Sequence, residues 1–275
     1  MISSTIFNIF RKGSKTYFYS SLFFPSSIRE DVFVLYSFVR VVDDFVDHIP
    51  QQKKQFYAFK NEYLKAVKGT ASKNIIIQGF VDLCQRKQIK KIWVDSFFDA
   101  MEADLTKKNY QTIQELEKYI YGSAEVIGLI MAKIMDLPKA SYPVARKFAK
   151  TMQLCNFIRD IDEDYSLGRT YLPKTELAKF GLTKLSPDTA AKTPVKFNNF
   201  ITYQINRYFK WNKQAKSGYK YLPFQFLIPI KTANDLYEWT LKEIQKDPQI
   251  VFSKKIKPSV SRIILQIGKN SLSRS

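Results

Sequence analysis

Residues 31–47 read DVFVLYSFVRVVDDFVD, and this stretch decides the fold class. Its apolar residues recur every three or four positions, the spacing that places them on one face of an α-helix. No segment alternates apolar and polar residues as a half-buried strand would. The sequence therefore predicts an all-α protein in which residues 1–275 form a single domain. The same period predicts further helices at 53–68, 74–86, 91–104, 112–135, 141–165, 197–216 and 230–246.

The segment Tyr119–Met135 is apolar nearly all round, which is typical of a central buried helix. Gly122 and Gly128 each weaken such a helix by about 1 kcal/mol relative to alanine. Either a close helix contact or a ligand pressed against the backbone would account for them. Of the eleven prolines, only Pro229 lies where it would kink a helix. The segment Leu182–Pro194 is expected to be a mobile loop.

The charge of the chain restricts its partners. Lys and Arg number 44 and Asp and Glu number 25, which gives a net charge of +19. This surplus favours phosphorylated substrates, anionic lipid or polyanions. The basic residues are spread along the chain and no nucleic-acid-binding module is recognisable, so no nucleic-acid partner is expected. No apolar run is long enough to span a membrane and no secretory signal is recognisable, which predicts a cytoplasmic protein with peripheral contact at the inner membrane face. A monomer and a homodimer both stay open.

Several classes of site are excluded by composition. Two cysteines, Cys84 and Cys155, rule out a disulfide scaffold, and we expect both to be small buried hydrophobes. The only histidine, His48, rules out His-rich zinc sites and is expected at a solvated helix end. No glycine-rich nucleotide motif is present, so no nicotinamide cofactor is expected.

Acidic side chains gather at two places. Asp43 and Asp47 are four residues apart and project from one helix face, and a second stripe runs along residues 153–164. Acids at this spacing repel one another, and Mg²⁺ commonly binds through one or two carboxylates plus substrate phosphates. The first cluster alone would be more typical of a solvated helix end than of a metal site. Together the two clusters favour a site where metal ions and a diphosphate bridge the two stripes.

Motifs along nearly the whole chain resemble those of the squalene/phytoene synthase family, the head-to-head prenyl transferases. The similar segments are residues 14–19, 35–47, 119–128, 153–164, 168–173, 233–237 and 251–252. The run Gly-Arg-Thr-Tyr-Leu-Pro at 168–173 is more similar to bacterial phytoene synthases than to eukaryotic squalene synthases. The resemblance implies an isoprenoid-synthase-type helical bundle around a central apolar cavity.

The same resemblance implies the reaction. Two allylic prenyl diphosphates would condense head to head through a cyclopropyl diphosphate intermediate, with release of diphosphate. Two geranylgeranyl diphosphates giving phytoene is the favoured version. The alternatives are squalene or dehydrosqualene synthesis from farnesyl diphosphate, and a non-catalytic assembly factor. Mg²⁺ is the implied cofactor, with Mn²⁺ as a substitute.

The resemblance also implies roles for individual residues. Apolar side chains of the 119–135 helix would line the prenyl channel, and Gly122 and Gly128 would leave it room. The implied catalytic residues are Tyr36, Arg40, Tyr119, Gln153 and Asn156; the diphosphate-binding residues are Ser14, Lys15, Arg40, Arg159, Arg169 and Tyr237; and the metal ligands are Asp43, Asp47, Asp160 and Asp164.

Two positions depart from the family pattern. Glu125 stands where the family carries glycine, and its carboxylate has either to pair with a nearby Arg or Lys or to narrow the pocket. Ile250 stands where an arginine for the diphosphate is expected. Lys254 or Lys255 would then supply the positive charge, without the bidentate geometry of arginine.

Overall fold

The computed structural model describes residues 2–272, which fold into helices without any β-strand. A single isolated bridge joins Asn109 and Thr170. The predicted all-α fold class is confirmed. The α-helices are α1 (Ser4–Gly13), α2 (Lys15–Ser21), α3 (Ser26–Asp47), α4 (Lys53–Val67), α5 (Ile75–Arg86), α6 (Lys91–Asp104), α7 (Ile113–Ile120), α8 (Val126–Ile134), α9 (Tyr142–Arg159), α10 (Ile161–Ser166), α11 (Lys174–Lys179), α12 (Pro187–Lys192), α13 (Pro194–Ala215), α14 (Phe224–Lys246) and α15 (Val260–Leu272).

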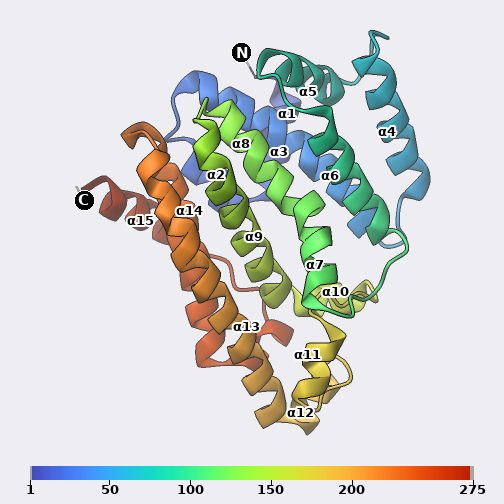
Figure 1. The fold of residues 1–275 in the computed structure, drawn as a ribbon, viewed down its shortest axis with the longest axis vertical. Coiled ribbons are helices and arrows are strands. Elements are labelled where there is room, and N and C mark those ends of the chain that lie inside the picture. The colour runs from blue at the N-terminus through green and yellow to red at the C-terminus, as the bar shows by residue number, and fades with distance from the viewer. Residues whose placement is uncertain (1, 273–275) are drawn as a thin grey trace.

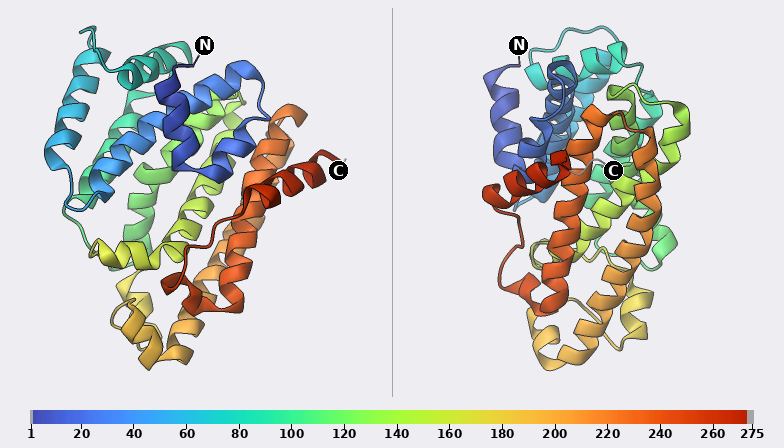
Figure 2. Two further views of the ribbon diagram at one scale, coloured as in Figure 1. Left: turned by 180° about the vertical axis from the view of Figure 1, so that it is seen from behind. Right: turned by 90° about the vertical axis from the view of Figure 1, so that its left-hand side faces the viewer.

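Helix α9 lies in the middle of the bundle, against α8 on one side and α13 and α14 on the other (Figure 1). Helix α3 buries the apolar stripe that its sequence predicted, with Val42 and Val46 almost fully enclosed. The short helices α11 and α12 lie at one end of the bundle, and α4 and α5 lie toward the opposite end, as both views in Figure 2 show. No helix in residues 2–272 is long and apolar enough to cross a membrane.

Two predicted helices are interrupted. The 112–135 helix contains a π-helical turn, Tyr121–Glu125, between α7 and α8. The 141–165 helix breaks at Asp160, whose backbone leaves the helical region with φ −101° and ψ 19°. Helix α14 begins at Phe224, earlier than the predicted 230–246 helix, and Pro229 lies inside it. Interruptions of this kind depend on contacts with other helices, which periodicity does not register.

The expectation of a loop over Leu182–Pro194 is wrong for half of that segment. Helix α12 occupies Pro187–Lys192, and the Ser186 hydroxyl caps it by accepting a hydrogen bond from the Thr189 N–H at 3.2 Å. Leu182 and Leu185 are buried, so the segment is fixed to the core by apolar contacts. The sequence analysis also missed α1, α2, α11 and α15.

The two glycines of the central helix serve helix packing. A Cβ atom on Gly122 would lie 2.3 Å from the Ser96 carbonyl oxygen in α6. A Cβ atom on Gly128 would lie 2.6 Å from the Ala145 carbonyl oxygen in α9. Both glycines therefore let neighbouring backbones approach closely. Gly122 lies outside the cavity lining, so the expectation that it leaves room in a channel is corrected, whereas Gly128 both packs against α9 and borders the cavity.

Candidate active site

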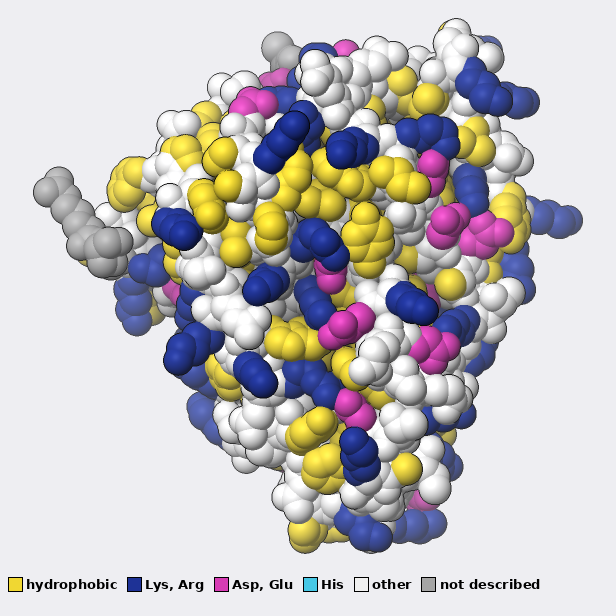
Figure 3. All heavy atoms as spheres, viewed as in Figure 1, with side chains coloured by type: hydrophobic (Ala, Val, Ile, Leu, Met, Phe, Trp, Pro, Cys, Tyr) yellow, Lys and Arg dark blue, Asp and Glu magenta, His cyan; other side chains and the backbone are white. Residues whose placement is uncertain are grey.

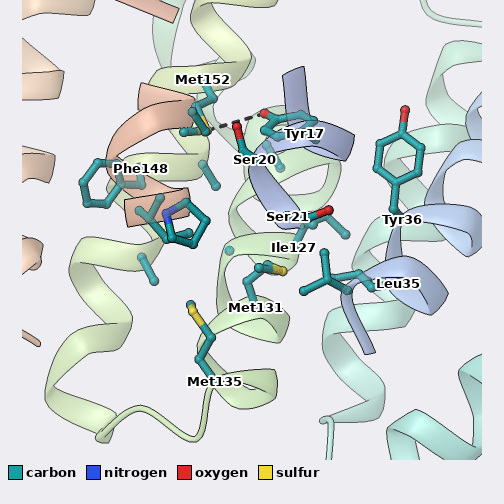
Figure 4. A pocket seen from close by; sticks show the side chains of 18 of the residues that line it. Tyr17, Ser20, Ser21, Leu35, Tyr36, Ile127, Met131, Met135, Phe148 and Met152 are labelled. Carbon is teal, nitrogen blue, oxygen red and sulfur yellow. Dashed lines mark hydrogen bonds between the residues drawn. The ribbon is translucent and has the colours of Figure 1, made fainter. Parts of the chain in front are cut away.

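An apolar cavity of about 1450 Å³, counting its open mouth, lies between α2, α3, α8, α9 and α14. Met131 and Met135 line one end, and Tyr17 meets Met152 toward the other (Figure 4). Gly128 lets α8 approach α9 closely, and Pro229, which cannot donate a backbone hydrogen bond, lies inside α14 beside the cavity. The lining is dominated by apolar side chains, as a site for hydrocarbon chains requires.

Polar residues of the predicted catalytic set meet at this cavity. The Tyr36 ring stacks on Phe10 with ring centroids 4.0 Å apart. The Asn156 amide donates to the Gln153 side chain at 3.2 Å. Asn156 Oδ1 is buried and has no hydrogen-bond partner among the described residues. The structure therefore brings Tyr36, Gln153 and Asn156 together around one hollow.

The first acidic cluster lies at the C-terminal end of α3. Arg40 forms ion pairs with Asp43 at 3.2 Å and with Asp44 at 2.5 Å. Burial and repulsion from Asp47 raise the pKa of Asp43 to about 8, although Arg40 opposes the shift. A raised carboxylate pKa means that the negative charge here is incompletely compensated by the protein.

The second acidic cluster lies where α9 gives way to α10. Arg159 donates two hydrogen bonds to Asp160, at 2.7 and 2.6 Å, and Lys255 approaches the same carboxylate at 3.1 Å. Burial and repulsion from Asp160 and Asp47 raise the pKa of Asp164 well above its usual range. The Arg169 guanidinium donates to Asp47 Oδ1 at 2.6 Å and its backbone N–H donates to the Asp164 carbonyl at 2.7 Å, so the ends of the two clusters lie near one another.

The remaining predicted diphosphate ligands occupy different settings. The Ser14 hydroxyl caps α2 by accepting from the Tyr17 N–H at 3.3 Å, and the adjacent Lys15 is exposed. The Tyr237 hydroxyl donates to that of Tyr17 at 2.7 Å. Arg169 is buried and reaches Asp47 Oδ1 at 2.6 Å, so it ties the second motif to the first.

Tyr119 points away from the cavity. Its hydroxyl donates to Asp104 Oδ2 at 2.6 Å, and Tyr171 donates to Asp104 Oδ1 at 2.9 Å. The sequence analysis missed Asp104, Tyr171 and Tyr17. A single acid at the end of an amphipathic helix gives little signal, because most such residues face solvent.

The two departures from the family pattern have visible partners. Glu125 is buried and accepts from Arg146 Nε at 2.6 Å, so the predicted pairing with a cation is found, and Glu125 does not line the cavity. Lys255 approaches Asp160 and also contacts Glu163, which places one of the two predicted substitute lysines at the second acidic cluster.

The histidine and the two cysteines were expected to have no role in the site, and two of these three residues lie in the surroundings that we expected. His48 is exposed at the end of α3, and its Nδ1 lies 3.0 Å from the Pro50 carbonyl oxygen. Cys155 is buried, and burial raises the pKa of its thiol to about 12. Cys84 is only partly buried.

The acidic clusters fit a metal only in part. Among residues 2–272, no three acidic, His or Cys side chains lie close enough to form a ready-made metal site. Asp47 and Asp164 are nevertheless both joined to Arg169, Asp47 through its carboxylate and Asp164 through its backbone carbonyl, and Mg²⁺ commonly takes one or two carboxylates with the rest of its ligands from phosphates and water. The donor set therefore suits a magnesium site that a diphosphate completes.

Comparison with known proteins agrees with this geometry. The chain is 27% identical to the 4,4′-diapophytoene synthase of Staphylococcus haemolyticus over 64% of its length and 63% of that protein. It is 31% identical to phytoene synthase 1 of Solanum lycopersicum over 62% of its length, but spans only 42% of that relative. The 15-cis-phytoene synthase of Synechococcus elongatus is 24% identical, over 88% of the chain and 83% of the relative.

Solved structures share the fold. A dehydrosqualene synthase superposes with a TM-score of 0.86 at 20% identity, covering 97% of this chain and 94% of its own. A squalene synthase from Alicyclobacillus acidocaldarius gives 0.77 at 22% identity, covering 87% and 91%. The model of the squalene/phytoene synthase family matches residues 10–263. The chain therefore belongs to the squalene/phytoene synthase family.

Proposed function

We propose that this protein joins two allylic prenyl diphosphates head to head and releases diphosphate, with two geranylgeranyl diphosphates giving phytoene as the favoured reaction. The observation that carries the proposal is an apolar cavity whose lining includes Tyr36 and Asn156, combined with two acidic clusters that Arg169 ties together. Hydrocarbon chains and diphosphates need these two environments side by side.

Each part of the site has a task in that reaction. Asp43, Asp47, Asp160 and Asp164 would hold Mg²⁺, or Mn²⁺ in its place, and the metal would stabilise charge on the departing diphosphate. Arg159 and Lys255, now on Asp160, are the cations closest to that carboxylate and would turn to the diphosphate oxygens. The Tyr36 ring faces the cavity and would stabilise an allylic cation, while the apolar walls exclude water that would quench it.

We also propose a cytoplasmic protein with peripheral contact at an anionic membrane. Lys and Arg side chains are scattered over the face shown in Figure 3 and outnumber the acidic ones. Helix α15 adds outward apolar side chains: Ile264 and Leu265 are each 59% exposed, and Leu272 is 85% exposed. Apolar residues flanked by Arg262 and Lys269 suit the interface of an anionic bilayer. Monomer and homodimer remain alternatives.

Product analysis tests the reaction. The protein is incubated with Mg²⁺ and either a C15 or a C20 allylic diphosphate, and the hydrocarbon products are identified. A C40 product from the C20 substrate supports the favoured version. A C30 product from the C15 substrate supports the alternative, squalene or dehydrosqualene synthesis. Asp164→Asn is the matched inactive variant. Turnover of neither substrate, with wild-type folding intact, rejects the proposal and favours a non-catalytic assembly factor.

A further inference from the structure

Asp104 is a buried carboxylate that the proposed reaction does not use. It is the last residue of α6 and is only 2% exposed. Both oxygens accept hydrogen bonds from neutral groups, the hydroxyls of Tyr119 at 2.6 Å and Tyr171 at 2.9 Å. Neutral donors satisfy its lone pairs and leave its charge in place. A buried charge of this kind requires a compensating cation nearby.

Arg169 is that cation. It is 3% exposed, and its guanidinium donates to Asp47 Oδ1 at 2.6 Å, to the Val46 carbonyl at 2.5 Å and to the Tyr171 hydroxyl at 3.3 Å. Tyr171 in turn donates to Asp104, so a continuous chain of hydrogen bonds runs from Asp47 to Asp104.

Two carboxylates are thus linked to one buried cation, Asp47 directly and Asp104 through the Tyr171 hydroxyl, and they differ in access. The Asp47 side chain is 41% exposed, whereas Asp104 is enclosed. Asp47 Oδ2 has no hydrogen-bond partner in the described part of the chain, while Oδ1 is held by Arg169. Asp47 is the carboxylate in direct contact with Arg169, so removing the charge of Asp104 would strengthen the attraction between Arg169 and Asp47.

We propose that Asp104 is a positioning residue that shares the charge of Arg169 and thereby keeps Asp47 available to a divalent cation. It touches neither substrate nor metal and acts through Arg169. The inference rests on the proposed magnesium site and adds to it a residue in a different helix. It predicts that the affinity of the acidic clusters for Mg²⁺ depends on a carboxylate that is separated from them by a tyrosine and an arginine.

The experiment measures metal binding without turnover. Full-length protein is titrated with Mg²⁺ in the presence of inorganic diphosphate, and the unfolding temperature is measured at each Mg²⁺ concentration. The midpoint is the Mg²⁺ concentration that gives half of the maximal rise in unfolding temperature. Asp104→Asn keeps the size of the side chain and removes its charge, so the midpoint should rise about tenfold, the scale of one unit charge acting in a partly buried site. Tyr119→Phe removes a hydrogen bond to Asp104 but no charge, and its midpoint should stay within about twofold of the wild type.

A matched control separates charge sharing from general damage. Glu176 in α11 is also buried and accepts from Arg207 at 2.8 Å, and it belongs to neither acidic cluster. Glu176→Gln should lower the unfolding temperature and leave the Mg²⁺ midpoint unchanged. An equal midpoint shift in Glu176→Gln, or an unchanged midpoint in folded Asp104→Asn, overturns the proposal.

A second variant, Arg169→Gln, should shift the Mg²⁺ midpoint in the opposite direction. Arg169→Gln removes the cation that competes for Asp47, so Mg²⁺ should bind at a lower concentration than in the wild type. This variant decides the matter if Asp104→Asn does not fold, since unchanged or weakened Mg²⁺ binding in Arg169→Gln contradicts charge sharing. Should the wild type itself give no response to Mg²⁺ with diphosphate, the magnesium site fails and this inference fails with it.

Discussion

Replacing Gly128 by alanine tests what the glycines of the central helix are for. The new Cβ atom would lie 2.6 Å from the Ala145 carbonyl oxygen and 2.9 Å from the Ala149 Cβ. Ordinary contact requires α8 and α9 to separate by roughly 0.8 Å, because the clashing atoms belong to backbone and to a side chain that cannot rotate away. Overpacking generally costs about 1–3 kcal/mol, and a clash against backbone falls in the upper half of that range, about 2–3 kcal/mol, while the gain in helix propensity returns about 1 kcal/mol.

The expected net result is a loss of about 1–2 kcal/mol in the free energy of unfolding. In thermal unfolding this corresponds to a fall of roughly 2–6 °C for a chain of this size. Gly268 supplies the matched control, because it lies inside α15 with nothing within 4 Å of its position. Gly268→Ala should stabilise the protein by up to about 1 kcal/mol.

The outcome distinguishes two roles for Gly128, which are close packing of α8 against α9 and space for the substrate in the cavity. Gly128 also borders the cavity, so a role in leaving space for substrate would show as a change in product chain length. If Gly128→Ala is as stable as the wild type and makes a shorter product, the packing argument is refuted. A destabilised variant with the same product confirms it.

Three further predictions concern the site and the surface. Because burial raises the pKa of Asp43 to about 8, Mg²⁺ must displace a proton from this carboxyl at lower pH, so the Mg²⁺ midpoint in diphosphate should rise as the pH falls from about 8.5 to 6.5. Asp43→Asn should reduce that slope, and the part that remains belongs to other titrating groups such as Asp164, whose pKa is also raised. Glu125→Gly removes the ion pair with Arg146 and should lower stability by about 1–2 kcal/mol in denaturant unfolding, while the product assay stays unchanged because the carboxylate lies outside the cavity lining. Replacing Ile264 and Leu265 by serine should weaken sedimentation with anionic vesicles roughly tenfold, and equal binding would remove α15 from the proposed membrane contact.

Periodicity predicted the parts of the fold that depend on single helices. Helix α3 carries its apolar stripe in consecutive turns, so its buried face is readable without any partner. The break at Asp160 is different, because Arg159 and Lys255 hold that carboxylate from two directions and Lys255 lies far along the chain. Helix α12 was missed for a related reason: its short length gives too few turns for a period to be recognised.

The acidic clusters could be recognised because each is local in sequence, and the mutual repulsion of their acids suggested that metal ions and a diphosphate bridge them. The side-chain directions around them could not, and Tyr119 shows why. Its place in the motif suggested a position beside the reacting carbons, yet its hydroxyl is fixed by Asp104 from α6, and Tyr171 shares the same carboxylate. A tyrosine that gives up its hydroxyl to a buried acid cannot also direct it into the cavity. Motif spacing therefore determines which groups gather near a site. Which of those groups faces the substrate is determined by hydrogen-bond partners on other helices, and Asp104 is such a partner for both Tyr119 and Tyr171.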